Sequence, residues 1–388
     1  MKTLRLRSVI AFAAATALLA ACGGGGSDTA PRTTTTSVKV MGDSLADVGT
    51  FGIKFTVQGA ASKVYPERVA QSYGIASMCN FFAFTGTTFV VNPTPGCTNY
   101  AIGGGVINGA GSGLTAADPR TISVQMQTAA AAGSYGAGDL LVIDGGGNDA
   151  AALVGAYLAT ATGGAPAVTA YSTLLSTVLA PAVVASNLGA GASGFAAVGR
   201  PYMSALADLF HDQIASRVLA NGATRVVLLN MPAITNTPRF QLVLDSIAAA
   251  NGGGAAGTTA RAQAEGLFKS WVEAFNAQLA TRFAGNANVV LVDFYTAFND
   301  QVASPAQYLL TNVKTPACPI TGLGTDGLPT YTFGSCTDAA LSAAPPAGVT
   351  DPNWWKSYAF SDGFHPTPYG HQLLAQLISR ALSRAGWL

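Results

Sequence analysis

The sequence predicts an α/β fold, a three-layer α/β/α sandwich with a central, mostly parallel sheet. Four short apolar runs rich in Val, Leu and Ile indicate buried strands, near residues 38–41, 140–144, 225–230 and 288–293. Helical stretches near 203–220 and 259–283 separate the later runs, as parallel strands require. We expect residues 369–388 to close the fold as a final helix.

A candidate nucleophile follows the first of these strands. The sequence Gly-Asp-Ser-Leu at 42–45 predicts a turn that lifts the Ser44 hydroxyl clear of the sheet. A neutral hydroxyl is a poor nucleophile until a neighbouring base removes its proton. The chain has three histidines, His211, His365 and His371. The first and last fall in predicted helices, where surface or packing roles are more common, so His365 is the preferred base.

Asp362 and His365 lie in one short segment near the C-terminus. Pro366 biases His365 towards an extended backbone, which restricts the orientation of its ring. Asp362, three residues earlier, can accept the Nδ1 proton and stabilise the imidazolium that forms when Nε2 takes the serine proton. Ser44, His365 and Asp362 thus divide the work of nucleophile, base and orienting group. Each motif alone also occurs in ordinary polar turns, so the prediction rests on their combination.

Two glycine-rich segments supply candidate hydrogen-bond donors for a developing oxyanion. Residues 145–149 directly follow a predicted strand, where open α/β sheets carry ligand sites, and Asn148 can donate its amide. Residues 99–105 end in three glycines whose backbone N–H groups no side chain shields. A capped strand-to-helix connection and a flexible loop are the alternative interpretations of these two segments.

Together the four segments resemble the GDSL, or SGNH, family of lipases and esterases, from about residue 38 to the C-terminus. The resemblance implies the SGNH hydrolase fold and a serine acyl-enzyme that needs no metal or cofactor. It also implies Ser44 as nucleophile and backbone oxyanion donor, Gly104 as a second backbone donor, and Asn148 as the side-chain donor. Asp362 and His365 complete the implied site.

Departures from the family pattern are small. Met41 stands where a phenylalanine is frequent, and Gly105 replaces a more usual alanine; we expect neither to touch a reacting group. A classical α/β-hydrolase is excluded because the chain has no Gly-x-Ser-x-Gly elbow. Two alternatives to a carboxylic ester hydrolase remain: an acyltransferase that uses the same acyl-enzyme, and a non-catalytic surface-binding protein.

The N-terminus predicts export and lipidation. Three basic residues precede an apolar run at 9–21, and Leu-Ala-Ala-Cys at 19–22 resembles a bacterial lipoprotein cleavage box. We therefore expect a signal peptide at 1–21, a lipid on Cys22 and a flexible tether at 22–37. Gly23 lacks the carboxylate that favours inner-membrane retention, which indicates a membrane anchor in the outer membrane. A secreted or periplasmic protein with an ordinary signal peptide is the alternative.

The number of cysteines agrees with export from the cytoplasm. With Cys22 as the lipid site, Cys79, Cys97, Cys318 and Cys336 remain, an even number that predicts two disulfides outside the cytoplasm. Pairing of sequence neighbours, 79 with 97 and 318 with 336, is the simplest of three possible connectivities.

Composition and charge exclude several classes of partner. A net charge of +1 without a long basic stretch gives no footprint for nucleic acid. A zinc site is improbable because no Cys-x-x-Cys motif or helical His pair occurs. Residues 189–194 match a dinucleotide fingerprint but follow no clear strand, so we expect a loop and no cofactor.

Residues 38–388 are predicted to form one hydrolase domain with two insertions. The first, near 150–200, contains no charged side chain between Ala150 and Gly199 and predicts packed helices, either buried or covering an acyl group. The second, near 315–360, is loop-rich. Its Trp354, Trp355 and Tyr358 either line the ester pocket or pack against the last helix. The expected partner is a small-molecule or lipid ester.

Overall fold

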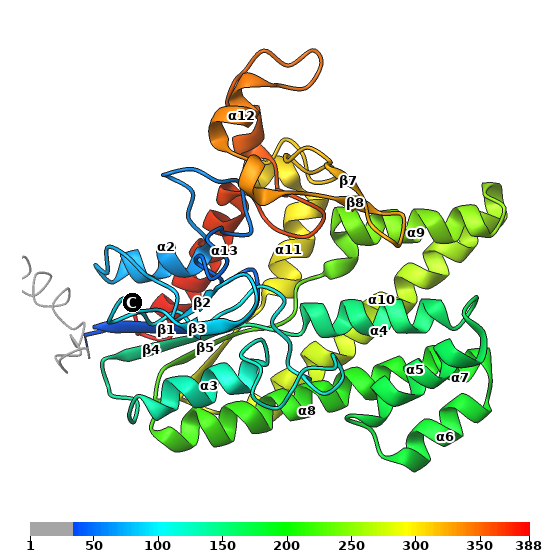
Figure 1. Ribbon diagram of the computed structural model, residues 1–388, viewed down its shortest axis with the longest axis horizontal. Helices are drawn as coiled ribbons and strands as arrows, with labels where there is room; N and C mark the ends of the chain where they lie inside the picture. Colours follow the sequence, from blue (N-terminus) through cyan, green and yellow to red (C-terminus); the bar gives the residue numbers. More distant parts are fainter. Residues whose placement is uncertain (1–33) are drawn as a thin grey trace, which may run out of the picture. The chain divides into compact units, whose positions relative to one another are not determined.

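A parallel sheet of four strands forms the centre of the described part of the chain (Figure 1). The computed structural model describes residues 34–388, of which Thr35–Leu388 form one compact unit. The strands are β1 (Ser37–Met41), β4 (Asp139–Ile143), β5 (Val226–Leu229) and β6 (Val289–Val292), in the order β1-β4-β5-β6. Val40, Val142, Val227 and Val290 face one another in register across all four. The four strands predicted from the sequence are confirmed.

A short extended segment continues the sheet beyond β1. Tyr100 N donates to Val40 O at 2.7 Å, and Val40 N donates to Thr98 O at 3.0 Å, which makes a parallel bridge between Val40 and Asn99. The glycine-rich segment that follows residue 100 therefore leaves the sheet at the same edge as Ser44.

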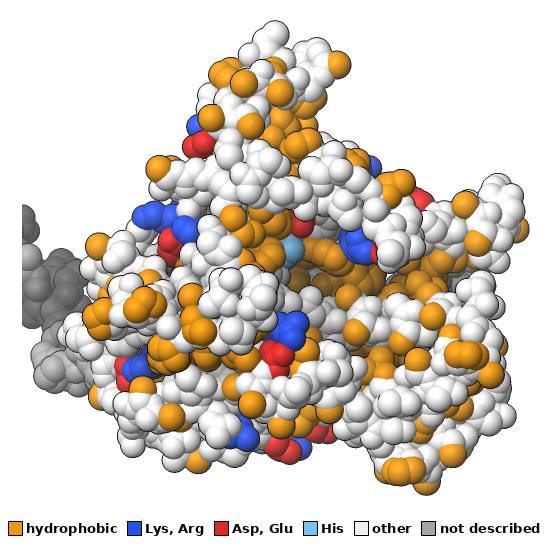
Figure 2. Space-filling view, viewed as in Figure 1, with side chains coloured by type: hydrophobic (Ala, Val, Ile, Leu, Met, Phe, Trp, Pro, Cys, Tyr) orange, Lys and Arg blue, Asp and Glu red, His pale blue; other side chains and the backbone are white. Residues whose placement is uncertain are grey.

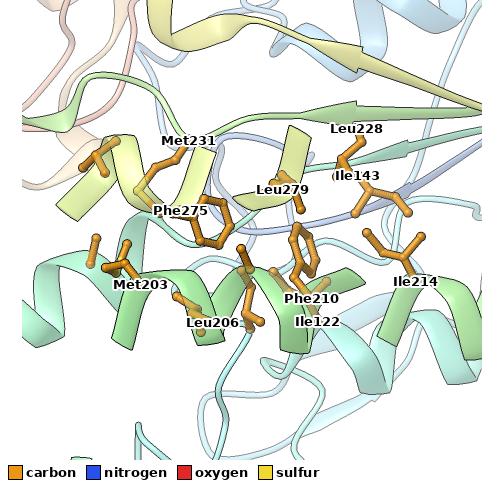
Figure 3. Packing of buried hydrophobic residues seen from close by; sticks show 14 of the residues in the cluster. Ile122, Ile143, Met203, Leu206, Phe210, Ile214, Leu228, Met231, Phe275 and Leu279 are labelled. Carbon is orange, nitrogen blue, oxygen red and sulfur yellow. The ribbon is translucent and has the colours of Figure 1, made fainter. Parts of the chain in front are cut away.

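Helices cover both faces of the sheet, because alternate strand side chains point to opposite sides (Figure 1). On one face, α3 (Ile122–Ala131), α4 (Gly147–Ala159), α8 (Gly199–Arg217), α9 (Pro238–Ala250) and α10 (Gly254–Phe283) join a core with strand residues such as Ile143 and Leu228. Figure 3 shows these two side chains facing Phe210 and Ile214 of α8. On the other face lie α2 (Tyr65–Ser72), α11 (Phe294–Ala303) and α13 (Pro368–Arg384). The predicted three-layer α/β/α class is confirmed.

The first insertion is an outer layer of helices. It comprises α4, α5 (Gly164–Ser176), α6 (Pro181–Gly189) and α7 (Ala192–Ala197). In α5 and α6 only Tyr171, Leu175 and Val184 are buried, so a fully buried insertion is not what forms: small alanine and glycine side chains leave much of this layer in contact with solvent. The loop predicted at residues 189–194 is confined to Ala190 and Gly191, because Gly189 ends α6 and residues 192–194 begin α7. The element before this turn is a helix rather than a strand.

Both neighbour-paired disulfides are present. Cys79–Cys97 encloses the hairpin of β2 (Phe82–Phe84) and β3 (Phe89–Val91), and Cys318–Cys336 encloses that of β7 (Gly322–Leu323) and β8 (Pro329–Thr330). The simplest connectivity predicted from the sequence is therefore confirmed. Each bridge closes a loop of 18 residues in separation, a length at which a disulfide contributes about 3 kcal/mol.

The second insertion has a small core of its own. Trp354, Trp355, Phe333 and Val57 pack around the Cys318–Cys336 bridge, next to α12 (Asp338–Ala343). The two tryptophans therefore pack within the insertion rather than in the ester pocket. Cys318 N donates to Ser361 O at 2.8 Å, which ties this core to the segment that precedes Asp362.

Short 3-10 segments complete the described elements: η1 (Leu219–Asn221), η2 (Ile234–Asn236), η3 (Pro305–Tyr308), η4 (Phe333–Ser335) and η5 (Trp354–Ser357). Within residues 34–388, no helix combines the length and apolar character needed to cross a bilayer. The predicted signal peptide, Cys22 and most of the tether lie outside the described residues.

Candidate active site

Ser44 stands in a tight turn at the carboxyl end of β1. Gly42 is required there, because a Cβ at this position would meet Asp144 Oδ1 at 1.6 Å. Asp43 N donates to the same Asp144 oxygen at 3.1 Å, and Ala46 N returns to Asp43 O at 3.1 Å. The end of β4 thus holds the turn that carries Ser44, whose residue is 8% exposed.

A continuous hydrogen-bonded chain joins Ser44, His365 and Asp362. Ser44 Oγ lies 2.7 Å from His365 Nε2, and His365 Nδ1 lies 2.9 Å from both carboxylate oxygens of Asp362. Because the carboxylate accepts the Nδ1 proton, Nε2 is left free to accept the serine proton. The structure therefore brings Ser44 together with a histidine 321 positions away in the sequence and with the aspartate that orients it.

The turn around His365 is held by its own backbone. Asp362 Oδ1 accepts from the backbone N–H of Phe364 at 2.8 Å and of His365 at 2.6 Å. Ser361 N donates to His365 O at 2.7 Å, and Phe360 bridges Pro366 across the turn. The imidazole packs against the rings of Phe55 and Phe333, whose centroids lie 5.2 and 5.5 Å from its own. These contacts fix the ring before any substrate binds.

Opposing effects set the pKa values of the pair. Burial lowers the pKa of His365, but the charge and hydrogen bond of Asp362, with a contribution from Asp43, outweigh it and leave that pKa above 6.5. For Asp362, burial raises the pKa, while the positive charge of His365 and several hydrogen bonds lower it below its ordinary value. The site therefore favours an ionised carboxylate beside an imidazole that gains a proton readily.

The predicted oxyanion donors lie beside Ser44. Asn148 is in the first turn of α4, and its Nδ2 donates to Gly105 O at 2.9 Å, so one amide proton is used to hold the neighbouring loop. Gly104 has a φ of +78°, a left-handed backbone that favours glycine. Ser44, Gly104, Asn148 and His365 all line one cavity.

Gly105, noted above as a departure from the family pattern, has a steric reason. A Cβ at residue 105 would approach Gly42 O to 2.5 Å and press on the turn that carries Ser44. Two buried carboxylates anchor the same loop. Asp149 accepts from Ile107 N at 3.0 Å and Asn108 N at 2.9 Å, and Asp47 accepts from Gly103 N at 2.8 Å.

The sequence reasoning missed the buried carboxylates beneath the site. Asp43 and Asp144 are buried together, and Tyr65 OH donates to Asp144 Oδ2 at 3.0 Å. Burial raises the pKa of Asp43, and burial with the charge of Asp43 raises that of Asp144 well above its ordinary value. The sequence does mark Asp144 as a candidate site residue, because it directly follows an apolar strand and precedes the Gly-rich segment.

The two other histidines lie away from the cavity. His371 of α13 is fully buried and its Nδ1 accepts from Tyr65 N at 3.3 Å; burial lowers its pKa to about 3. His211 of α8 contacts Asp212 and Arg282. Among residues 34–388, no cluster of three or more His, Cys, Asp or Glu side chains is arranged to hold a metal ion.

The cavity in front of Ser44 has a volume of about 390 Å³. Figure 2 shows a hollow with a histidine at its floor and hydrophobic side chains around it. Its apolar wall consists of Leu45, Phe55, Ala151, Leu229, Pro232, Ile234, Phe294, Phe298, Phe360, Phe364 and Pro366. From the first insertion only the start of α4 reaches it, at Gly147, Asn148 and Ala151. Helices α5–α7 contribute no lining side chain among the described residues, so the cover over an acyl group considered from the sequence does not form there.

Comparison with known proteins identifies the family. A model of the GDSL-like lipase/acylhydrolase family matches residues 38–378. The chain belongs to this family. A search of curated proteins found no match. Among solved structures, an extracellular lipase from Streptomyces rimosus shares 15% sequence identity, over 89% of this chain and 100% of the lipase chain, with a TM-score of 0.38.

Membership of the GDSL-like lipase/acylhydrolase family supports a hydrolase that acts on esters. The four segments quoted from the sequence fall inside the matched span, and the structure gathers all four around one cavity.

The balance of effects on His365 can be measured directly. We expect its pKa to lie above 6.5 in the wild type, and Asp362→Asn to lower it, because burial then acts without the opposing negative charge. NMR titration of the histidine rings is simple with three histidines in the chain. His371, buried and neutral, serves as the internal reference that does not titrate near neutral pH. An unchanged His365 pKa in Asp362→Asn would contradict the assigned cause.

Proposed function

We propose that this protein hydrolyses carboxylic esters through an acyl-enzyme on Ser44. The observation that carries the proposal is the 2.7 Å contact between Ser44 Oγ and His365 Nε2, backed by Asp362 and opening on an apolar cavity. Few arrangements besides nucleophilic acyl transfer use a serine, a histidine and a carboxylate in this order of hydrogen bonds.

The geometry fits each step of the reaction. Ser44 Oγ attacks the ester carbonyl carbon while His365 Nε2 takes its proton, and Asp362 stabilises the imidazolium. The negative charge on the carbonyl oxygen is then stabilised by the N–H groups of Ser44 and Gly104 and by the Asn148 amide. The imidazolium returns its proton to the leaving alcohol, and water, activated by the same histidine, releases the carboxylic acid.

The cavity favours substrates with an apolar portion. Apolar side chains form most of its wall, whereas the buried carboxylates of Asp43 and Asp144 lie at the end nearest Ser44. A chain of methylene groups gains about 0.8 kcal/mol for each group removed from water. Small or lipid esters with an acyl chain are therefore the proposed substrate class.

Loss of the nucleophile or the base should have nearly the same effect. We expect Ser44→Ala and His365→Ala each to lose at least about 10³-fold in kcat, and the double variant little more, because the residues act as a unit. Ester turnover is measured with and without an acceptor alcohol, which separates hydrolysis from acyl transfer. An organophosphonate should label Ser44 in the wild type. Substantial turnover by folded Ser44→Ala would refute the mechanism.

The amide of Asn148 has a separate test. We expect Asn148→Ala to reduce kcat by about 10² to 10³ with little change in KM, because the charge it stabilises develops mainly in the transition state. Asn187→Ala is the matched control, since Asn187 is a half-buried asparagine of α6 that does not line the cavity. An effect confined to KM would assign Asn148 to ground-state binding instead.

We further propose that the protein is a lipoprotein of the bacterial outer membrane, anchored through Cys22. The proposal rests on the cleavage box at 19–22, and the two disulfides agree with a non-cytoplasmic compartment. We expect Cys22→Ser to abolish attachment of the lipid at residue 22 and to release the protein from the membrane fraction. Sedimentation of Cys22→Ser with outer membranes at the wild-type level would refute lipid anchoring.

A further inference from the structure

Arg239 is the one lysine or arginine among the described residues that line the cavity. It is the second residue of α9, and its backbone N donates to Gly363 O at 3.0 Å. Gly363 lies between Asp362 and His365, and a Cβ there would approach Arg239 Cβ to 3.1 Å. The backbone of this arginine is therefore fixed directly to the turn that carries the candidate base.

The guanidinium lies on the apolar side of the cavity. Its Cζ sits 5.7 Å from the centre of the Phe364 ring, and that ring centre is 6.4 Å from the centre of the His365 ring. Phe364 also lines the cavity. A substrate held at Ser44 can thus extend along Phe364 towards a fixed positive charge.

Asp326 is the counter-ion of Arg239 in this structure. It belongs to the turn between β7 and β8, and it pairs with Arg239 Nη2. The Arg239 side chain is 30% exposed and the Asp326 side chain is 45% exposed. Ion pairs exposed to this degree contribute little to stability, so a second anion can replace Asp326 at small cost. Guanidinium groups bind carboxylates and phosphates through paired N–H donors.

We propose that Arg239 is a specificity residue that binds an anionic group of the substrate, a carboxylate or phosphate remote from the scissile ester, with Asp326 as its resting counter-ion. The inference rests on the proposed ester hydrolase and names a class of substrate for it. It assigns Arg239 no part in bond breaking.

The distribution of charge in the cavity explains why the anion must be remote. Asp43 and Asp144 lie at the end of the cavity near Ser44, and a substrate anion placed there would face two buried acidic groups. Two uncharged polar side chains of the lining, Asn230 and Thr237, already donate to Asp293 Oδ1 and Ile234 O, and the apolar side chains offer no partner for a charge. Binding at Arg239 therefore also orients the substrate, with its ester towards Ser44.

The test uses pairs of esters that differ only in a terminal charge. Half-esters of dicarboxylic acids of increasing chain length are compared with neutral alkanoate esters of the same length and the same alcohol. We expect Arg239→Met, which keeps an apolar stem over Phe364, to lower the ratio of kcat/KM for charged over neutral esters by about tenfold to a hundredfold. The loss should appear mainly in KM, and Arg239→Lys should restore part of it.

Two more variants are compared with Arg239→Met: one is a control with no expected effect, and the other should have the opposite effect. Arg282→Met removes an arginine that pairs with Asp208 and Asp212 on α8, outside the cavity, and should leave the ratio unchanged. Asp326→Asn removes the resting counter-ion and should raise the ratio above that of the wild type. The inference is overturned if this ratio is the same in Arg239→Met and in the wild type for every class of charged ester and at every chain length.

Two further sets of esters test where on the substrate the anionic group lies and which anion it is. Esters with the carboxylate on the alcohol side test the other direction of binding, and phosphate-bearing alcohols test the second anion class. The proposed role of Arg239 is supported if Arg239→Met lowers the kcat/KM ratio for any one class of charged ester, and it is rejected if the ratio falls for none of them. Failure of the proposed function is distinguishable, since it would appear as absence of turnover for neutral esters in the wild type, whereas failure of this inference leaves that turnover intact.

Discussion

The contact between Gly42 and the Asp144 carboxylate determines where Ser44 stands. Asp144 ends one strand and Gly42 the neighbouring strand, and only a glycine allows the two to approach this closely. Gly105 packs against the same turn, where a Cβ would approach Gly42 O to 2.5 Å. Three backbone segments therefore converge at the carboxyl edge of the sheet, and each delivers one part of the candidate site: Ser44 from the turn after β1, Asn148 from the segment after β4, and Gly104 from its glycine-rich loop.

This convergence costs stability. Burial raises the pKa of Asp149 from 3.8 to about 6, so the folded protein holds that proton more tightly than the unfolded chain. The contribution of protonated Asp149 to folding is present below 3.8 and is lost as the pH rises towards 6. Asp43 and Asp144 shift in the same direction. Ionisation of the carboxylates that align the loops therefore lowers the stability of the fold as the pH rises towards neutrality.

The sequence was sufficient for the parts of the structure that local chemistry determines. Apolar runs predicted all four central strands, and the spacing of Asp362, His365 and Pro366 predicted a turn that the backbone hydrogen bonds explain. No periodicity connects Ser44 with His365 across 321 residues; their pairing was predicted because the other two histidines fall in helices, and the family resemblance added to that argument. Contacts made only by tertiary packing, such as Tyr65 with Asp144, had no local signal.

The second insertion shows the same limit of prediction from sequence. Trp354 and Trp355 were equally compatible with a pocket wall and with packing, and the small core around the Cys318–Cys336 bridge decides for packing. That core in turn supports the hairpin that presents Asp326 to Arg239. The edge of the sheet thus fixes the chemistry, whereas α9 and a disulfide-bonded insertion shape the far end of the cavity. Substrate choice can therefore change through these peripheral segments while Ser44, His365 and Asp362 keep their geometry.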